Sequence, residues 1–183
     1  MVFYSHAPRK FTHELIQEYA ARYEYTDYPP FVAKGYLTLE ELKQIGTWKS
    51  KRPQKHYAAN NDSFVIEVTT AAFQKEASEE FRIRVLTLLN GVGYPVASAL
   101  LHVGHDTSYP IIDFRNLWSL WQVGLSDIKY TPALWAAYAQ TCKEMAMQYN
   151  VPVRTIDRAL WQYSKENQKN VPDIDPHEDL ESA

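Results

Sequence analysis

The sequence predicts an all-α protein, and three observations carry that prediction. Apolar residues recur at the 3.6-residue spacing of helices from Thr12 to Gln168, and no segment shows the alternation typical of a strand. Each periodic segment also begins near a residue type that caps helices. With 183 residues, 45% of them hydrophobic, the chain can bury a core without disulfide bonds. We therefore expect one compact helical domain over residues 1–169.

The first two helices are defined by their ends. Thr12 caps a helix that runs to about Tyr25, after which a Pro-Pro pair prevents its continuation. Thr38 and Glu41 form a capping box that opens a short helix through residue 45, and Gly46 is expected to end it. The basic stretch that follows, residues 49–56, is expected to be a loop.

Two amphipathic helices come next. Asn61 or Asp62 caps the first, in which Phe64, Val68 and Ala72 repeat at intervals of four residues and are expected to face the core. Ser78 opens the second, which ends at residues 90–93. For this second helix the spacing predicts three inward residues, Phe81, Val85 and Leu88, and two outward arginines, Arg82 and Arg84.

The rest of the chain predicts four more helices. One begins near Pro95, one is capped by Asp113, the longest runs from Thr131 to about residue 150, and the last covers about residues 153–168. The longest helix carries Cys142 on its inner face, where a thiol behaves as a small core residue. Residues 170–183 hold five acidic residues and no Lys or Arg, so we expect a disordered acidic tail.

Two glycines flank one apolar residue between two of these helices, at Gly91, Val92 and Gly93. Glycine adopts positive φ freely, so this spacing predicts a tight turn whose valine enters the core. The amide groups of such a turn, together with the start of the next helix, can bind a phosphate oxygen. The same residues also suit a turn between helices that binds nothing.

The longer segment LNGVGYPVASALLHVGHDTSYPIIDFRNLWSL resembles the helix-hairpin-helix core of the HhH-GPD superfamily of DNA glycosylases. Gly91, Val92 and Gly93 match the hairpin of that family, and Ala97 and Ala99 lie in its small-residue helix. Asp113 falls where the family keeps its catalytic aspartate. The core covers about residues 79–121.

This resemblance implies a fold of two helical lobes with the hairpin and the aspartate at the mouth of a cleft. It also implies a monofunctional DNA glycosylase of base-excision repair, which hydrolyses the N-glycosidic bond of a damaged or mispaired base flipped out of DNA. Lyase-competent members carry a lysine just after the hairpin, where this chain has Pro95, so no lyase activity is expected. With Cys142 as the one cysteine, no iron–sulfur cluster is expected either. Some hairpins of the family hold a monovalent cation through backbone carbonyls.

Asp113 is also a candidate on chemical grounds. Cleavage of an N-glycosidic bond builds positive charge on the deoxyribose, and a nearby carboxylate stabilises that charge or deprotonates the attacking water. The competing interpretation is an N-cap that accepts the amide of Arg115 or Asn116. Both roles are compatible, because a cap fixes the direction of the carboxylate.

The densest basic cluster precedes the hairpin in the sequence. Its cations are Lys49, Lys51, Arg52 and Lys55, and Trp48 and His56 lie beside them. Cations interleaved with an aromatic ring suit a strand backbone and a stacked base. Arg82 and Arg84 are candidates for further phosphate contacts, or for surface pairs with Glu79 or Glu80. A run of charges is more often a solvated loop, and that interpretation of the basic cluster is the simpler one.

Several other residues are of types that occur in functional sites. Tyr94 and Tyr109 are candidate aromatic contacts to a base, whereas the helical spacing of Trp118, Trp121, Trp135 and Trp161 predicts core packing. His102 and His105, with Asp106 next to them, have a spacing seen in metal sites, but no fourth ligand is visible, so no metal is expected. Asp157 and Arg158 are expected to form a structural ion pair.

Composition and charge limit the localisation and the partners that we expect for the protein. The sequence shows no signal peptide and no run of 18 apolar residues, so a cytoplasmic protein without a membrane span is expected. The net charge is −3, and without the five acids of the tail 19 basic and 17 acidic residues leave +2. This balance is compatible with DNA as a partner. It leaves two alternatives open: a catalytically inactive nucleic-acid-binding module, and a helical interaction protein without nucleic acid.

Overall fold

Six of the described helices begin where local side-chain hydrogen bonds satisfy their first amides. This computed structural model describes residues 11–29 and 34–169. Thr12 Oγ1 accepts from the amide of Leu15, and Thr38 with Glu41 forms the expected capping box. Each of four further helices starts in the same way, with a side-chain acceptor at Asn61, Ser78, Asp113 and Thr131. The predicted caps are therefore confirmed.

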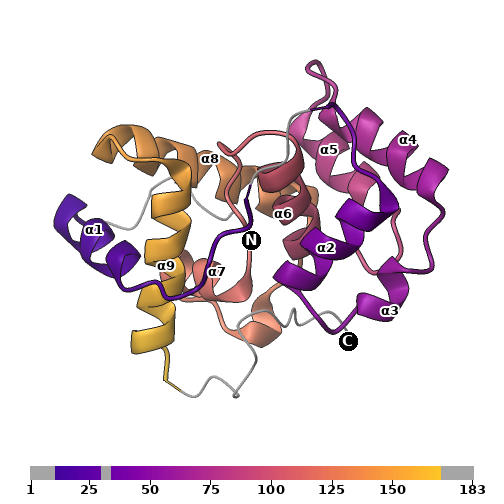
Figure 1. Ribbon diagram of the computed structural model, residues 1–183. Coiled ribbons are helices and arrows are strands. Elements are labelled where there is room, and N and C mark those ends of the chain that lie inside the picture. Colours follow the sequence, from indigo (N-terminus) through magenta and orange to yellow (C-terminus); the bar gives the residue numbers. More distant parts are fainter. Residues whose placement is uncertain (1–10, 30–33, 170–183) are drawn as a thin grey trace. The chain divides into compact units, whose positions relative to one another are not determined.

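The described residues contain nine α-helices, one short 3₁₀ helix and no strand, which confirms the all-α prediction. The helices are α1 (His13–Ala21), α2 (Leu39–Lys49), α3 (Gln54–Tyr57), α4 (Asp62–Phe73), α5 (Glu79–Leu86), α6 (Tyr94–Gly104), α7 (Phe114–Trp121), α8 (Pro132–Tyr149) and α9 (Val153–Asn167), with η1 (Leu125–Asp127) between α7 and α8 (Figure 1). The acidic tail at 170–183 lies outside the described residues.

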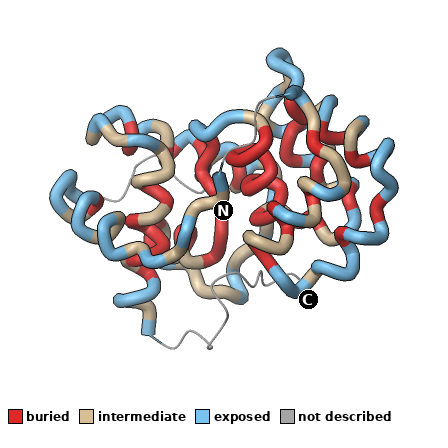
Figure 2. Tube along the Cα trace, in the orientation of Figure 1, coloured by how far each residue is buried: buried red, intermediate tan, exposed pale blue. Residues whose placement is uncertain are grey.

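The described chain divides into two compact units. Unit 1 comprises residues 11–26 and 108–169, and unit 2 comprises residues 27–29 and 34–107. Unit 1 is therefore built from both ends of the described chain, with α1 packed on α9. Arg22 joins them by donating to Glu166 at 3.0–3.1 Å. In both units the buried positions follow one side of most helices (Figure 2).

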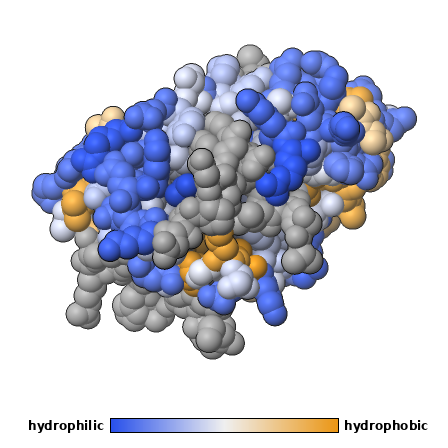
Figure 3. All heavy atoms as spheres, turned by 90° about the horizontal axis from the view of Figure 1, so that it is seen from below, coloured by the Kyte–Doolittle hydropathy of each residue, from blue (hydrophilic) through white to orange (hydrophobic). Residues whose placement is uncertain are grey.

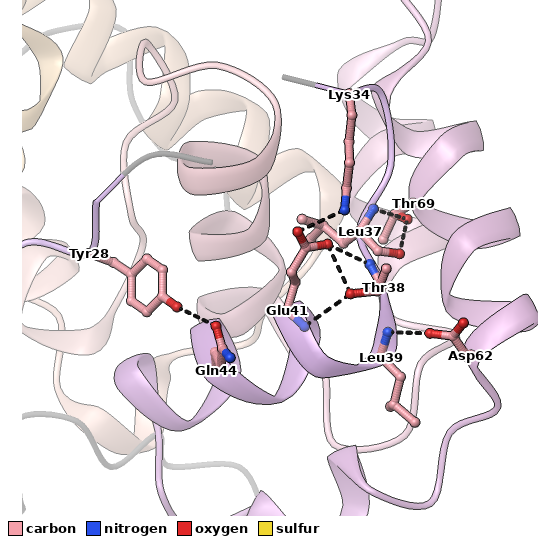
Figure 4. A network of polar contacts seen from close by, with 9 residues as sticks. All are labelled: Tyr28, Lys34, Leu37, Thr38, Leu39, Glu41, Gln44, Asp62 and Thr69. Atoms are coloured by element: carbon pink, nitrogen blue, oxygen red, sulfur yellow. Dashed lines mark hydrogen bonds and ion pairs between the residues drawn. The ribbon is translucent and has the colours of Figure 1, made fainter. Parts of the chain in front are cut away.

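The start of α2 is fixed by a polar network within unit 2 (Figure 4). Beyond the capping box, Glu41 accepts from Lys34 at 2.8 Å and the amide of Leu39 donates to Asp62 at 2.7 Å. Thr69 of α4 accepts from the amide of Leu37 at 2.9 Å. The network ties α2 to α4, so the first turn of α2 has few unsatisfied amides.

The ends of α2 and its neighbour differ from the prediction. Gly46 lies inside α2, which continues to Lys49, and the expected loop at 49–56 contains the short helix α3. A Cβ at Gly46 would come 2.7 Å from the ring of Tyr57, so the glycine makes room for an aromatic ring. Glycine is therefore required here by packing and not by a helix terminus.

The predicted faces of α4 and α5 are partly wrong. Phe64 and Phe81 are exposed, and Leu88, which follows α5, is 61% exposed. Val68 and Ala72 are buried as expected, but they share the inner face of α4 with Val65. Figure 3 shows hydrophobic surface on the right, the side on which α4 lies in Figure 1.

Arg82 explains the face that α5 buries. Its guanidinium donates to the carbonyl of Ala72 at the end of α4 and to that of Lys75 at 3.1 Å, and the residue is 4% exposed. A helix leaves its last carbonyls without partners, and an arginine fork can satisfy two of them. Arg82 therefore faces inward with Ile83 and Leu86, whereas Arg84 is exposed and pairs with Glu80 at 2.9 Å.

Candidate functional site

The turn between α5 and α6 has the tight form that its glycines predict. The amide of Val92 donates to the carbonyl of Leu89 at 3.0 Å, and Gly91 has a φ of +80°. Val92 is 5% exposed, so its side chain enters the core as expected. Gly93 is the N-cap of α6, and its carbonyl accepts from the amide of Ala97 at 2.8 Å.

Asn60, a residue that sequence reasoning missed, holds this turn in place. Its Oδ1 accepts from the amide of Asn90 at 2.8 Å, and its Nδ2 donates to the carbonyl of Asn90 at 3.0 Å. The same Nδ2 also reaches the carbonyl of Tyr57 at 3.0 Å. Asn60 is 6% exposed, so one buried amide side chain ties the hairpin to the end of α3.

Tyr57 provides the second connection between α3 and the hairpin. Its ring is fully buried between two glycines: a Cβ at Gly46 or at Gly91 would come within 3.0 Å of its carbon atoms. At Gly91 the same Cβ would also lie 2.9 Å from Cβ of His56. No larger residue fits at either glycine, so α3 packs directly against the hairpin backbone.

This packing brings the basic cluster to the hairpin. Lys51, Arg52 and Lys55 are exposed beside or within α3, whose last residue contacts Gly91. Lys49 departs from the expected set: it is 6% exposed at the end of α2 and is not available to a ligand at the surface. Trp48 is half-buried, and its ring meets that of Tyr28 edge to face at 5.7 Å.

Two backbone amides of the hairpin, those of the half-buried Gly91 and the buried Gly93, make no hydrogen bond within the described residues. These amides and the first turn of α6 form a local concentration of partial positive charge. Tyr94, the first residue of α6, is half-buried, and burial raises the pKa of its hydroxyl. Unit 2 thus combines amide donors with the exposed cations of the 51–55 segment.

Asp113 lies in unit 1, where it is the N-cap of α7. Its Oδ1 accepts from the amide of Asn116 at 3.0 Å, and the residue is 6% exposed. The capping interpretation is therefore confirmed, with Asn116 and not Arg115 as the donor. The arrangement fixes the direction of the carboxylate, as either role requires.

A buried polar network supports the chain next to Asp113. Asn116 Nδ2 donates to the carbonyl of Ile111 at 3.1 Å and to the hydroxyl of Tyr138 at 2.7 Å. The amide of Ile111 donates to Asp157 at 2.9 Å. Asp157 is paired with Arg154 at the other oxygen, so the pair expected with Arg158 is replaced by a pair one turn earlier.

Of three other candidate residues, Tyr109 and His102 are buried and His105 is half-buried. Tyr109 is 5% exposed and stacks on Trp135 with ring centroids 6.3 Å apart, so its ring packs inside unit 1. His105 stacks on Phe73 at 5.2 Å, and burial lowers the pKa of its imidazole. His102 is 7% exposed in α6. Within the described part of the chain, no group of three or more His, Cys, Asp or Glu side chains could hold a metal ion.

Comparison with known proteins gives no assignment: no family model, no curated protein and no solved structure matches the chain. None of the helices in the described ranges is long and apolar enough to cross a membrane. The function must therefore be inferred from the geometry of the two units.

Proposed function

We propose that the chain is a DNA-binding protein that holds the strand backbone with its hairpin, residues 90–94, and with the exposed cations Lys51, Arg52 and Lys55. The observation that carries this proposal is the packing of α3 on the hairpin through Tyr57 and Asn60. It gathers backbone amides and three cations on one unit. The resemblance of residues 85–121 to the HhH-GPD glycosylases supports the same function.

The physical basis is the recognition of phosphate. Amide groups at the start of a helix bind an anion without any side chain, and lysines and arginines release counterions when they neutralise phosphates. Phosphate contacts position a protein on DNA but carry no sequence information. The hairpin is therefore expected to give affinity and register, whereas any choice of base requires other residues.

The test compares two double variants of unit 2 with equal loss of charge. Lys51→Gln with Lys55→Gln removes cations beside the hairpin, and Lys43→Gln with Lys75→Gln removes cations that no observed contact places there. We expect the first pair to weaken duplex binding and to reduce the slope of log K against log salt by about 0.9 for each phosphate that is no longer neutralised. The control pair should keep the wild-type slope.

Gly93→Asp tests the hairpin itself, because it places a carboxylate where a phosphate would bind. DNA affinity should fall while the helical circular dichroism spectrum is retained. A folded Gly93→Asp protein with unchanged affinity would exclude the hairpin as the contact. A wild-type protein that binds no duplex would favour the alternative of a helical interaction protein without nucleic acid.

Hydrolysis of an N-glycosidic bond is the second candidate function, favoured by the fixed carboxylate of Asp113. In this reaction the bond between base and deoxyribose breaks, its electron pair leaves with the base, and water adds to the sugar and loses a proton. Asp113 would stabilise the developing positive charge or accept that proton. Pro95 offers no amine for a Schiff base, so the product would be an abasic site in an unbroken strand.

Asp113→Asn tests this reaction, because asparagine caps a helix about as well as aspartate. Duplexes carrying uracil, alkylated, oxidised or mismatched bases are incubated with each protein and then cleaved with alkali. We expect the wild type to release one of these bases and the variant to lose about 10²-fold or more. Borohydride should trap no covalent adduct. Full release by Asp113→Asn would remove Asp113 from the reaction, and no release from any lesion would leave DNA binding alone.

A further inference from the structure

Arg115, two residues after Asp113, has no hydrogen-bond acceptor among the described residues of unit 1. Arg115 Nε is buried, and among the described residues neither this nitrogen nor the rest of the guanidinium makes a hydrogen bond or ion pair. Buried polar groups are nearly always hydrogen-bonded, and Arg115 as a whole is half-buried, so part of its side chain is open to a ligand. Its burial lowers the pKa of the guanidinium, although the nearby charge of Asp113 acts in the opposite direction.

Aromatic rings hold this guanidinium in position. Its central carbon lies 5.3 Å from the ring centroid of Trp161 and 5.1 Å from that of Phe114. The ring of Trp161 in turn meets the rings of Tyr23 and Tyr25 edge to face, at 5.4 and 5.0 Å. A guanidinium on aromatic faces loses little freedom when it binds a ligand through its edge.

Further charged groups surround the same rings. Arg154 and Arg158 lie over Tyr23, at 5.3 and 5.7 Å from its centroid. Lys165 lies 5.7 Å from the centroid of Trp161 and pairs with Glu24 at 3.2 Å. Asp157 neutralises Arg154. The rings around Arg115 are therefore contacted by further cations of α9.

We propose that Arg115 binds a phosphate group through the edge of its guanidinium, which the rings of Trp161 and Phe114 hold in place. For a phosphate of a DNA strand, the inference rests on the proposed function and adds a contact in unit 1, next to Asp113. Arginine is suited to this ligand because its planar fork matches two phosphate oxygens. A free phosphate has the same chemistry, and the experiment separates the two sources.

Arg115→Gln removes the charge, and Arg22→Gln is its matched control in the same unit. Arg22 also lies on an aromatic ring, 4.3 Å from the centroid of Tyr19, but it already donates to Glu18 and Glu166. In the first measurement, duplex affinity of Arg115→Gln should fall about tenfold and its salt slope by about 0.9. Arg22→Gln should keep the wild-type values.

The second measurement uses inorganic phosphate alone. Sodium phosphate should raise the melting temperature of the wild type and of Arg22→Gln above the value in sodium chloride of equal ionic strength, and should raise that of Arg115→Gln less. A loss in the duplex measurement alone supports a strand phosphate, and a loss in the phosphate measurement alone supports a free one. No difference between the two variants in either measurement would overturn the inference.

If Arg115→Gln does not fold, chemical labelling of arginine in the wild-type protein tests the same inference. Phenylglyoxal should label Arg115, and duplex or inorganic phosphate should protect it, as mapped by mass spectrometry. Labelling that neither ligand reduces would contradict the inference. A wild type that binds no duplex, but whose Arg115 is protected by inorganic phosphate, would remove the proposed function and leave the phosphate site.

Discussion

At the scale of single residues, two positions of unit 2 require glycine for different physical reasons. Gly46 has ordinary helical geometry and is required because the ring of Tyr57 occupies the space of a Cβ. Gly91 meets the same ring but also has a φ of +80°, so packing and backbone conformation both require glycine there. The hairpin is therefore shaped by a side chain that precedes it by more than 30 residues.

A matched pair of variants separates these two costs. Gly35 has a φ of +83° with nothing within 4 Å of a Cβ, so Gly35→Ala should cost only the strain of positive φ, about 1 kcal/mol. Gly91→Ala adds a clash with His56 and Tyr57 and should destabilise the protein by about 2–4 kcal/mol. Urea unfolding measures both values. Equal losses would mean that α3 moves away from the hairpin at little cost.

Cys142 gives the stability of the protein a dependence on alkaline pH. The thiol is fully buried, and burial raises its pKa. Above about pH 8.5 the thiol ionises in the unfolded chain but not in the folded one, so the free energy of unfolding falls by about 1.4 kcal/mol per pH unit. This contribution is fully present below that pH and is lost as pH rises.

Cys142→Ala should remove that contribution. Between pH 9 and 10 its free energy of unfolding should fall by about 1.4 kcal/mol per unit less than that of the wild type, whatever the cavity costs at neutral pH. Denaturation with urea at several pH values measures the two slopes. Identical slopes would show that the thiol ionises in the folded protein.

At the scale of elements, α3 is a single turn that depends on its neighbours. An isolated helix of four residues is not stable in water, so its packing through Tyr57 and its hydrogen bonds to Asn60 must hold it. The exposed Lys51, Arg52 and Lys55 are placed by this turn. Any substitution that detaches α3 from the hairpin should therefore weaken DNA binding as well as destabilise the fold.

Asn60→Ala tests this dependence. It removes both hydrogen bonds to Asn90 and leaves the part-buried amide and carbonyl of Asn90 without these partners, which should cost about 1–3 kcal/mol. Amide hydrogen exchange at Val92 and in α3 should accelerate together, and DNA binding should weaken. Asn61→Ala is the control, because it removes a helix cap nearby without touching the hairpin. Faster exchange at Val92 in both variants would contradict the assigned role of Asn60.

At the scale of the whole molecule, unit 1 joins segments that are distant in the chain. α1 contacts α9, and Tyr149 donates to the carbonyl of Phe11 at 2.5 Å across 138 residues. Ile16 is fully buried in this unit. The neighbour of α1 in sequence, α2, belongs to unit 2. A destabilising substitution should therefore affect the helices that its residue contacts more than the helices next to it in sequence.

Ile16→Ala should show this by hydrogen exchange. The substitution should cost about 2–5 kcal/mol and accelerate exchange in α9 more than in α2. Leu42→Ala, at a fully buried position of α2, should have the reverse preference. A uniform acceleration of all helices in either variant would indicate that the two units unfold as one.

The sequence by itself determined most of the helices and the turn between α5 and α6, but not the helix α3 or the end of α2. A cap such as Thr38 with Glu41 joins residues three positions apart, and the positive φ of Gly91 is a property of its own backbone. Such signals are local, so they can be found without knowledge of the fold. The N-cap role of Asp113 was predictable for the same reason.

Only the tertiary structure decided which faces are buried and which residues form a site. Arg82 faces inward and donates to the carbonyl of Ala72. Lys49 is buried at the end of α2, which is longer than predicted. Asn60 meets Asn90 across 30 residues, a contact that no spacing in one sequence reveals. Which side chains are buried or hydrogen-bonded depends on which groups distant in the sequence become neighbours in space. Burial and hydrogen bonding stabilise contacts between such groups whatever their separation along the chain.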